Sequence, residues 1–291
     1  MTQKTSFPHF DQIRIENTNY CGYRCLMCPR DKHTRKQGVM SCEDFALVLS
    51  RIPPFSGEVH LHGFGEALLD KSLPEKVRLC KKHLPAALVG NYTTLGVPHK
   101  ESYFFDLIDS GIDALVVSCY GYTQEGYRAV HGRDTFEIVK RNLETIAKIR
   151  TLLESPLRLE VIPPGEEMLL SLQTAKESQD TFKTWVESLG FAFAPERRLH
   201  NYGDGRSYNR PSDRLCPVVQ GMRRSILQIT WDLKVIPCCY DYNATISFGS
   251  LRENTLQEIF SSPSYQAFVE AHLSGQLDQY PICQNCEKDL Y

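Results

Sequence analysis

The sequence is organised around residues 17–28, which read NTNYCGYRCLMC. Three cysteines in this stretch, Cys21, Cys25 and Cys28, stand in a C-x3-C-x2-C spacing. Residues 13–16 alternate between apolar and charged side chains directly before the stretch, and this alternation predicts a strand. We therefore expect the three thiols on the loop that leaves the first strand of the fold.

The three thiols favour an iron–sulfur cluster or zinc over an oxygen-preferring metal. Three thiolates can hold three irons of a cubane cluster and leave the fourth iron open. We therefore expect a [4Fe–4S] cluster with one vacant coordination position at Cys21, Cys25 and Cys28. Zinc is the alternative, but a structural zinc usually takes four ligands from two paired motifs. His33 is the only nearby candidate for a fourth ligand.

The composition is that of an ordinary globular chain with 291 residues, 42% hydrophobic content and a formal net charge of −2. No long basic run favours nucleic acid as a partner, and no apolar run of about eighteen residues indicates a membrane span. Residues 1–10 lack the apolar stretch of a signal peptide, so we expect a cytoplasmic protein. Because the charge pattern does not favour nucleic acid, we expect a small-molecule substrate. In a reducing compartment, clustered cysteines indicate metal binding or catalysis rather than disulfides.

Strand-like and helix-like segments alternate from residue 11 to about residue 195. The expected strands are residues 12–16, 58–61, 86–89, 114–118, 157–161 and 190–193. The expected helices are residues 41–51, 73–83, 100–110, 136–149 and 181–189. This order predicts an α/β fold, a parallel sheet closed in part as a TIM-like (β/α)6 barrel. Functional loops should then lie at the carboxyl ends of the strands, where residues 21–28, 63–66 and 91–94 and Ser118 all fall.

The composition shifts near Pro195, after which residues 196–214 are polar, basic and rich in Gly, Asn and Arg. Two strand-like runs and two short helix-like runs follow, at residues 225–230, 234–236, 255–260 and 265–272. The tight connection between the two strand-like runs predicts a β-hairpin. We therefore expect a barrel domain of residues 1–195 and a small C-terminal domain of residues 196–291, built from a β-hairpin and helices.

Further motifs accompany the cysteine loop. Gly63-Phe64-Gly65-Glu66 follows the second expected strand, Ser118 ends the fourth, and residues 121–137 continue the pattern. With Met27 between the last two thiols, these features resemble the radical S-adenosylmethionine superfamily over essentially the whole chain. The resemblance implies that S-adenosylmethionine binds the open iron and yields a 5′-deoxyadenosyl radical, which removes a hydrogen atom from the substrate. It also implies a reducing partner such as a flavodoxin or ferredoxin.

The same resemblance implies which residues contact S-adenosylmethionine, namely Met27, Gly65, Glu66, Ser118 and Arg128. Two positions depart from the family pattern. Ala67 replaces the proline that usually follows the glutamate, and His131-Gly132 stands where many members have Arg-Gly. The contact to the cofactor carboxylate is therefore open between Arg128, Arg133 and His131.

A second group of cysteines lies near the C-terminus, at Cys216, Cys238, Cys283 and Cys286. A four-cysteine zinc site is one interpretation. The segments around them, residues 232–238, 248–251 and 256–260, resemble the SPASM and twitch extensions of radical enzymes, which hold auxiliary [4Fe–4S] clusters. The short remainder of the chain implies the twitch form with one auxiliary cluster, so the resemblance implies two [4Fe–4S] clusters in all.

Four further cysteines, Cys42, Cys80, Cys119 and Cys239, lie outside these two sets of expected ligands. Cys239 is a ligand in place of Cys238, a packed thiol, or a hydrogen donor near the substrate. Cys42, Cys80 and Cys119 are isolated, and an isolated cysteine is usually a small apolar residue of the core.

The reaction expected first is dehydrogenation of an alcohol, because one auxiliary cluster can accept the second electron, as in twitch-domain aminocyclitol dehydrogenases. Arg197, Arg198 and His200 are the candidates for the base that removes the hydroxyl proton, and we expect Arg198 or His200 to take this role. Epimerisation of a sugar with Cys239 or Cys119 as hydrogen donor is the alternative. Peptide modification is less expected, since the cysteine motif already starts at Cys21 and leaves no room for an N-terminal peptide-binding domain.

Overall fold

The fold is taken from a computed structural model, which describes residues 9–163, 176–195, 200, 202–203, 205–206, 214–220 and 226–288. Within these residues, nine strands form one sheet in the order β6-β5-β4-β3-β2-β1-β7-β8-β9. Their bounds are β1 (Gln12–Ile15), β2 (Glu58–His60), β3 (Leu88–Thr93), β4 (Ala114–Ser118), β5 (Arg158–Ile162), β6 (Ala192–Phe193), β7 (Ile226–Ile229), β8 (Lys234–Ile236) and β9 (Gly249–Ser250). Strands β1 to β7 pair in parallel, and β8 and β9 are antiparallel additions.

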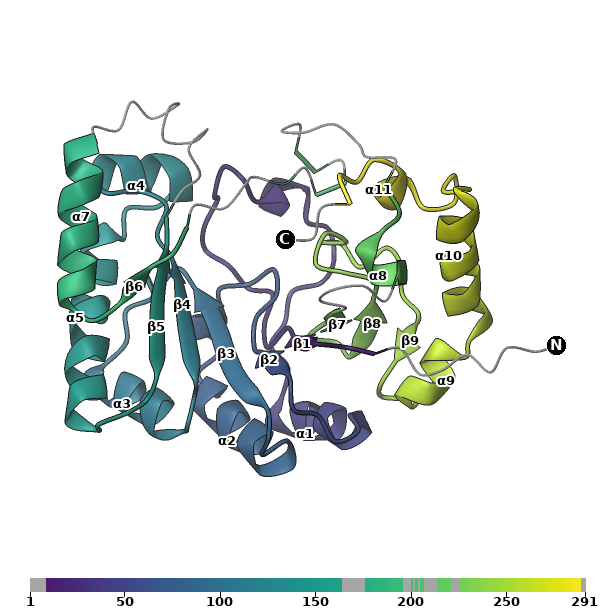
Figure 1. Cartoon of the computed structure of the whole chain (residues 1–291), viewed down its shortest axis with the longest axis horizontal. Helices are drawn as coiled ribbons and strands as arrows, with labels where there is room; N and C mark the ends of the chain where they lie inside the picture. The colour runs from purple at the N-terminus through teal and green to yellow at the C-terminus, as the bar shows by residue number, and fades with distance from the viewer. Residues whose placement is uncertain are drawn as a thin grey trace.

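Helices connect the parallel strands and surround the C-terminal strands. Those of the barrel are α1 (Cys42–Arg51), α2 (Leu73–His83), α3 (Glu101–Asp109), α4 (Gln124–His131), α5 (Phe136–Leu152) and α7 (Lys176–Ser188), with short 3-10 helices η1 (Pro29–Lys32) and η2 (Ala67–Leu69). The C-terminal ones are α8 (Pro217–Gln220), α9 (Leu256–Phe260), α10 (Pro263–Ser274) and α11 (Pro281–Gln284). Figure 1 shows α1, α2, α3, α5 and α7 along the outer face of the sheet, while α8 to α11 gather around β8 and β9.

Local sequence signals account for several of these boundaries. Ser41 caps α1, because its hydroxyl accepts a hydrogen bond of 3.0 Å from the backbone N–H of Asp44. Gly111 follows α3 with φ of +87°, and Gly132 ends α4 with φ of +65°. Glycine tolerates this left-handed conformation, in which other residues are strained. The ends of these helices are therefore set by single residues.

The two faces of the sheet differ in character because successive side chains of a strand point to opposite sides. The outward side chains are apolar and pack against the helices; they include Ile13, Ile15, Val59, Val89, Leu115, Val117, Leu159 and Val161. The inward side chains of β1 and β2 are polar instead. In the ladder, Arg14 pairs with His60 on one side and with Gln228 on the other, so three polar residues stand in one row across β2, β1 and β7.

The structure confirms the predicted α/β fold. Helices connect the strands of a parallel sheet as in a partial barrel, and small strands and helices follow at the C-terminal end. It adds one feature that the sequence pattern did not predict. The hairpin of β7 and β8 does not stand apart, because β7 pairs in parallel with β1 and continues the sheet of the barrel. The division at residues 195 and 196 stays a prediction. None of the helices in the described ranges has the length and hydrophobicity that crossing a membrane requires.

Candidate active site and cluster sites

A cavity of about 300 Å³ opens on the inner face of the sheet, at the carboxyl ends of the parallel strands. Most of the residues predicted to form the functional site line it: Cys21, Cys25, Cys28, Met27, Gly65, Glu66, Ser118, His200 and Cys239. The parallel arrangement explains this convergence, since the loops that leave successive strands meet at one edge. The loops therefore meet at the carboxyl ends of the strands, where the sequence analysis expected them.

The cysteine loop is held by the end of α4. The backbone N–H of Arg24 donates to the carbonyl oxygen of His131 at 3.1 Å, and that of Leu26 donates to Val130 at 2.9 Å. These carbonyls belong to the last turn of the helix, where they have no partner within the helix itself. The last turn of α4 therefore uses its free acceptors to fix the backbone around Cys25.

The electrostatics of the three thiols suit a cationic ligand. Burial raises the pKa of Cys21, Cys25 and Cys28, that of Cys28 to about 11, and neighbouring thiolates raise the pKa of Cys25 further. Three thiolates therefore do not ionise together here without positive charge, which cluster irons supply. Within the described ranges, no three Cys, His, Asp or Glu side chains converge closely enough to hold one metal ion.

Arg206 contacts the cysteine loop from the C-terminal part of the chain, and sequence reasoning did not identify it. Its Nε donates to the carbonyl oxygen of Leu26 at 3.0 Å, and its Nη2 donates to the carbonyl oxygen of Cys28 and, at 2.6 Å, to Asp31. A guanidinium offers several donors in a fixed geometry, so one side chain can hold two carbonyls of the loop.

The Gly-Phe-Gly-Glu segment packs directly against the cysteine loop. A Cβ at Gly65 would overlap the carbonyl oxygen of Thr18, and the N–H of Glu66 donates to the carbonyl oxygen of Tyr20 at 2.8 Å. The carboxylate of Glu66 accepts from the hydroxyls of Thr93 and Thr94 and from the N–H of Thr94 at 2.8 Å. The carboxylate of Glu66 thus joins the ends of β2 and β3.

The three residues expected as candidates to contact the cofactor carboxylate lie in different surroundings. Arg128 is exposed on α4 and is not among the residues that line the cavity. Arg133 lies over the ring of Tyr23, with its Cζ 5.9 Å from the ring centroid. His131 is buried, and its Nδ1 lies 3.3 Å from the Sγ of Cys25. Burial lowers the pKa of His131 to about 3.

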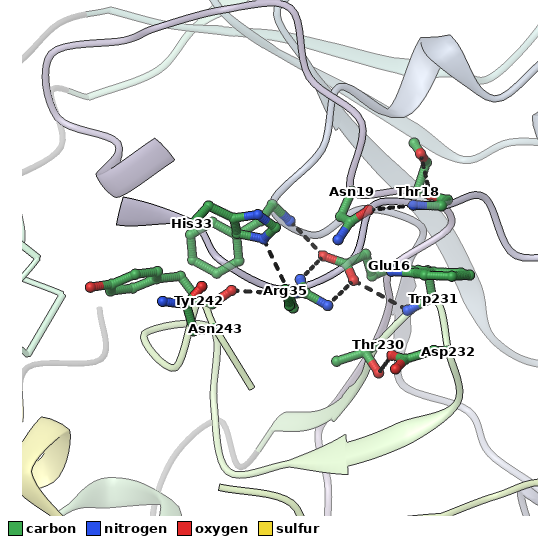
Figure 2. A network of polar contacts seen from close by, with 12 residues as sticks. Glu16, Thr18, Asn19, His33, Arg35, Thr230, Trp231, Asp232, Tyr242 and Asn243 are labelled. Atoms are coloured by element: carbon green, nitrogen blue, oxygen red, sulfur yellow. Dashed lines mark hydrogen bonds and ion pairs between the residues drawn. The ribbon is translucent and has the colours of Figure 1, made fainter. Parts of the chain in front are cut away.

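A buried ion pair links the barrel to the C-terminal hairpin, and the sequence pattern did not reveal it (Figure 2). Arg35 donates to both carboxylate oxygens of Glu16, at 2.7 and 2.5 Å. The same carboxylate accepts from the backbone N–H of Phe64 at 3.0 Å and of Trp231 at 3.2 Å. Arg35 also donates to the carbonyl oxygen of Tyr242 at 3.1 Å. One carboxylate thus connects β1, the glycine-rich turn and the hairpin.

All four C-terminal cysteines, Cys216, Cys238, Cys283 and Cys286, line a second cavity, together with side chains that are mainly apolar. Burial raises the pKa of all four thiols, and each of the other three raises the pKa of Cys238 electrostatically. Their donor set fits a thiolate-bound cluster. His272, from α10, also lines this cavity.

The two adjacent cysteines 238 and 239 face different cavities. Cys238 lines the four-cysteine cavity, whereas Cys239 lines the main cavity. Tyr240 lines both, so residues 238–240 form the wall between the two sites. This geometry favours Cys238 over Cys239 as the fourth thiol of the second site.

The remaining candidates are the possible bases and the isolated cysteines. His200 lines the main cavity, its ring lies 4.9 Å from that of Tyr240, and its Nδ1 lies 3.9 Å from an oxygen of Glu287. Arg197 and Arg198 lie outside the described residues. Cys80 and Cys119 are buried in the core, as expected for isolated thiols.

The cavity is also lined by Tyr92, from the expected loop at residues 91–94, and by four polar residues that the sequence pattern did not indicate, namely Gln12, Arg14, His62 and Gln228. The Oε1 atom of Gln228 is buried and has no hydrogen-bond partner among the residues that the structure describes. A buried acceptor of this kind is costly unless a ligand satisfies it. The alternation of polar residues at positions 12, 14 and 16 was the available signal for this part of the site.

Two family models match the chain. The radical SAM superfamily model matches residues 15–152, and the SPASM model, described as an iron–sulfur cluster-binding domain, matches residues 216–287. Between them they cover both cysteine groups.

Similar proteins agree with these matches. The S-adenosyl-L-methionine-dependent 2-deoxy-scyllo-inosamine dehydrogenase of Niallia circulans is 20% identical over 284 residues, which are 95% of this chain and 92% of that protein. The GTP 3′,8-cyclase of Chlorobaculum tepidum is 28% identical over 54% of this chain and 49% of that protein. The crystal structure of BtrN in complex with AdoMet and 2-DOIA superimposes with a TM-score of 0.62 at 19% identity, covering 97% of both chains. The structure of anSMEcpe with bound AdoMet also gives 0.62, at 15% identity, over 95% of this chain and 89% of that one. These structural likenesses show the fold.

Proposed function

The chain belongs to the radical SAM superfamily and carries an iron–sulfur cluster-binding SPASM domain, and from this membership we propose that it is a dehydrogenase of a small hydroxylated compound. As a radical SAM enzyme it binds S-adenosylmethionine and iron–sulfur clusters. The dehydrogenase named among its relatives extends over nearly the whole of this chain, which supports the choice of reaction.

The main cavity is proposed to hold the first [4Fe–4S] cluster through Cys21, Cys25 and Cys28, with S-adenosylmethionine beside Met27, the backbone of Gly65 and Ser118. The bound groups supply the one-electron chemistry that removes a hydrogen atom from the substrate. The protein holds them in place: the last turn of α4 and Arg206 fix the cysteine loop, and Glu66 fixes the turn that faces it. A flavodoxin or ferredoxin is the proposed source of electrons.

The observation that carries the proposal is the wall of residues 238–240 between the two cavities. Cys216, Cys238, Cys283 and Cys286 are proposed to ligate an auxiliary [4Fe–4S] cluster, for a total of two clusters. In this proposal the electron acceptor and the substrate lie on opposite sides of the wall of residues 238–240. Dehydrogenation removes two electrons, so it needs such an acceptor, whereas a redox-neutral reaction does not.

The substrate is proposed to lie on the polar row of Arg14 and Gln228, where hydroxyl groups find both donors and acceptors. His200 is the proposed base for the hydroxyl proton. Because its Nδ1 faces Glu287, its Nε2 is the nitrogen that takes up the proton. Arg198, which lies outside the described residues, stays the alternative base.

Epimerisation is the second candidate function, because Cys239 lines the main cavity, where a hydrogen donor to the substrate has to stand. Peptide modification stays a third hypothesis, without a feature of the described cavity that favours it.

Isotope labelling distinguishes these reactions. A substrate panel of polyols carrying deuterium on the carbinol carbons is incubated with the reconstituted enzyme, S-adenosylmethionine and reductant. A dehydrogenase moves deuterium into 5′-deoxyadenosine and gives a carbonyl product in equal amount. An epimerase run in deuterated water instead gives an alcohol product that has gained deuterium from solvent. If an alcohol product of that kind forms and no carbonyl compound appears, the dehydrogenase assignment is wrong.

A further inference from the structure

His131 is a fully buried residue at the end of α4 that lies beside the cysteine loop but outside the cavity. Its ring is stacked between two tyrosines. The ring centroid of Tyr127 lies 4.1 Å away and that of Tyr120 lies 5.2 Å away, the latter with an interplanar angle of 8°. The tyrosines leave the imidazole no freedom to rotate out of its plane, so its two nitrogens point in fixed directions.

The hydrogen bonds of the ring determine its tautomer. The backbone N–H of Tyr120 donates to Nε2 of His131 at 3.0 Å, so Nε2 carries a lone pair and no proton. A neutral imidazole then carries its proton on Nδ1. That nitrogen lies 3.3 Å from the Sγ of Cys25, which makes Nδ1 the donor and the sulfur the acceptor.

The backbone keeps this contact from relaxing. The carbonyl oxygen of His131 accepts from Arg24, and that of Val130 accepts from Leu26, so the residues on both sides of Cys25 are tied to the same helix end. The ring and the sulfur are therefore positioned by the same short segment, although they lie 106 residues apart in the sequence.

We propose that His131 is a positioning residue that raises the reduction potential of the N-terminal cluster, through an N–H···S hydrogen bond from its Nδ1 to Cys25. The reduced cluster carries one more negative charge than the oxidised cluster. A donor to a ligand sulfur stabilises the reduced state more, and hydrogen bonds to sulfur are among the features that set cluster potentials. The inference rests on the proposed function in one respect, that Cys25 ligates a cluster.

A matched pair of variants separates the donor from the packing. In His131→Gln the side-chain amide reaches the position of Nε2, so a partner for Tyr120 remains and the donor to Cys25 is lost. In His131→Asn the amide reaches the position of Nδ1, so the donor remains and the partner of Tyr120 is lost. Both substitutions remove the ring, so both leave a comparable space between the two tyrosines.

The measurement is a redox titration of the anaerobically reconstituted full-length chain, followed by the electron paramagnetic resonance signal of the reduced N-terminal cluster. We expect the reduction equilibrium of His131→Gln to weaken about tenfold, which is a midpoint about 59 mV lower for a one-electron couple. His131→Asn should stay near the wild-type midpoint. The second iron–sulfur signal, proposed for the C-terminal cysteines, is the internal control and should not move in either variant.

A second measurement needs no variant and protects the test against misfolding. In the wild-type chain labelled with 15N-histidine, pulsed resonance of the reduced N-terminal cluster should detect one weakly coupled histidine nitrogen and its exchangeable proton. Equal midpoints in both variants and the wild type overturn the inference. An equal drop in both variants with full iron content also overturns it, because packing then explains the effect. If the wild-type chain binds no cluster at Cys25, the proposed function fails as well, so the two failures are distinguishable.

Discussion

Arg35 binds both carboxylate oxygens of Glu16, and this buried pair stands where three parts of the chain meet. Glu16 follows β1 directly, and its oxygens also accept from Phe64 in the glycine-rich turn and Trp231 in the hairpin connection. The pair lines the main cavity as well. The carboxylate therefore ties the connection of the C-terminal hairpin to the glycine-rich turn, in addition to the pairing of β7 with β1.

Replacing Arg35 by Met should destabilise the protein by about 3 kcal/mol, because it leaves the Glu16 carboxylate buried without its cation. The Glu16→Gln/Arg35→Met double variant should recover part of the loss. Chemical unfolding followed by tryptophan fluorescence measures both effects. Arg252→Met is the control, since Arg252 pairs with Asp44 on the surface and such pairs contribute less than about 1 kcal/mol. Equal losses at Arg35 and Arg252 would contradict the assigned role of the pair.

Removal of Cys25 should end cleavage of S-adenosylmethionine and lower the iron content from about eight to about four atoms per chain, as for the loss of one of two [4Fe–4S] clusters. The reason is that two remaining thiolates do not hold the cluster. Chromatography of 5′-deoxyadenosine and anaerobic iron and sulfide analysis measure the result. Cys42→Ala is the matched control, because Cys42 begins α1 away from both cavities. Persistent 5′-deoxyadenosine in Cys25→Ala would overturn the central assignment.

The neighbouring variants Cys238→Ala and Cys239→Ala should behave differently, because the two thiols face different cavities. Cys238→Ala should lose about four irons and the carbonyl product while it still cleaves S-adenosylmethionine. Cys239→Ala should keep its iron and its dehydrogenase activity. Iron analysis combined with product analysis measures both. Loss of iron in Cys239→Ala with full iron in Cys238→Ala would reverse the assignment, and loss of an epimerised product in Cys239→Ala would favour the second function.

Gln228→Leu should make the protein slightly more stable and its substrate binding weaker. The substitution removes a buried acceptor that has no partner in the described part of the chain, which is worth about 1 kcal/mol in stability. It also removes a polar contact from the proposed substrate site, so KM should rise roughly tenfold or more. Thermal unfolding and steady-state kinetics give the two values. Ile236→Val alters the adjacent strand at the same register and serves as a control for packing. A stability gain with unchanged KM would exclude Gln228 from substrate binding.

The acid stability of the protein should depend in part on His33. Burial, with the nearby guanidinium groups of Arg30 and Arg35, lowers the pKa of His33 from 6.5 to about 4. A histidine with a lowered folded-state pKa contributes stability that is fully present above pH 6.5 and is lost as the pH falls toward 4. His33→Gln keeps an acceptor for Arg35 and removes the titration, so its thermal midpoint should fall less than that of the wild type between pH 7 and pH 5.

The control for this measurement is His83→Gln, since His83 is exposed at the end of α2 and contacts only the carbonyl of Leu79 among the hydrogen bonds described. This variant measures the effect of a histidine-to-glutamine change at an exposed position. Parallel curves for His33→Gln and the wild type would show that His33 does not titrate with unfolding.

Much of the fold was predictable because it depends on local patterns. The spacing of Cys21, Cys25 and Cys28 and the apolar strand at residues 114–118 are visible in short windows of the sequence. Strand bounds at 114–118 and 234–236 agree with the prediction to the residue. By contrast, α4 was not predicted, because Gly126 and several polar residues interrupt its apolar periodicity.

Other features depend on which distant segments pack together. The pairing of β7 with β1 joins residues 214 positions apart, and the contact of His131 with Cys25 joins residues 106 positions apart. A pattern in a short window of sequence does not show which of these distant segments meet. The exposed position of Arg128 follows likewise from how α4 is rotated against the sheet.

The sequence by itself determined that residues 17–28 form a cysteine loop after a strand and that a second set of cysteines lies near the C-terminus. Only the tertiary structure decided that Cys238 faces the second set and Cys239 faces the main cavity. The two cysteines follow β8 on a turn, which is closed by a hydrogen bond of 3.3 Å from the backbone N–H of Asp241 to the carbonyl oxygen of Cys238. Which cavity each thiol faces depends on how this turn packs between the two cavities, and the surfaces of those cavities exist only in the folded chain.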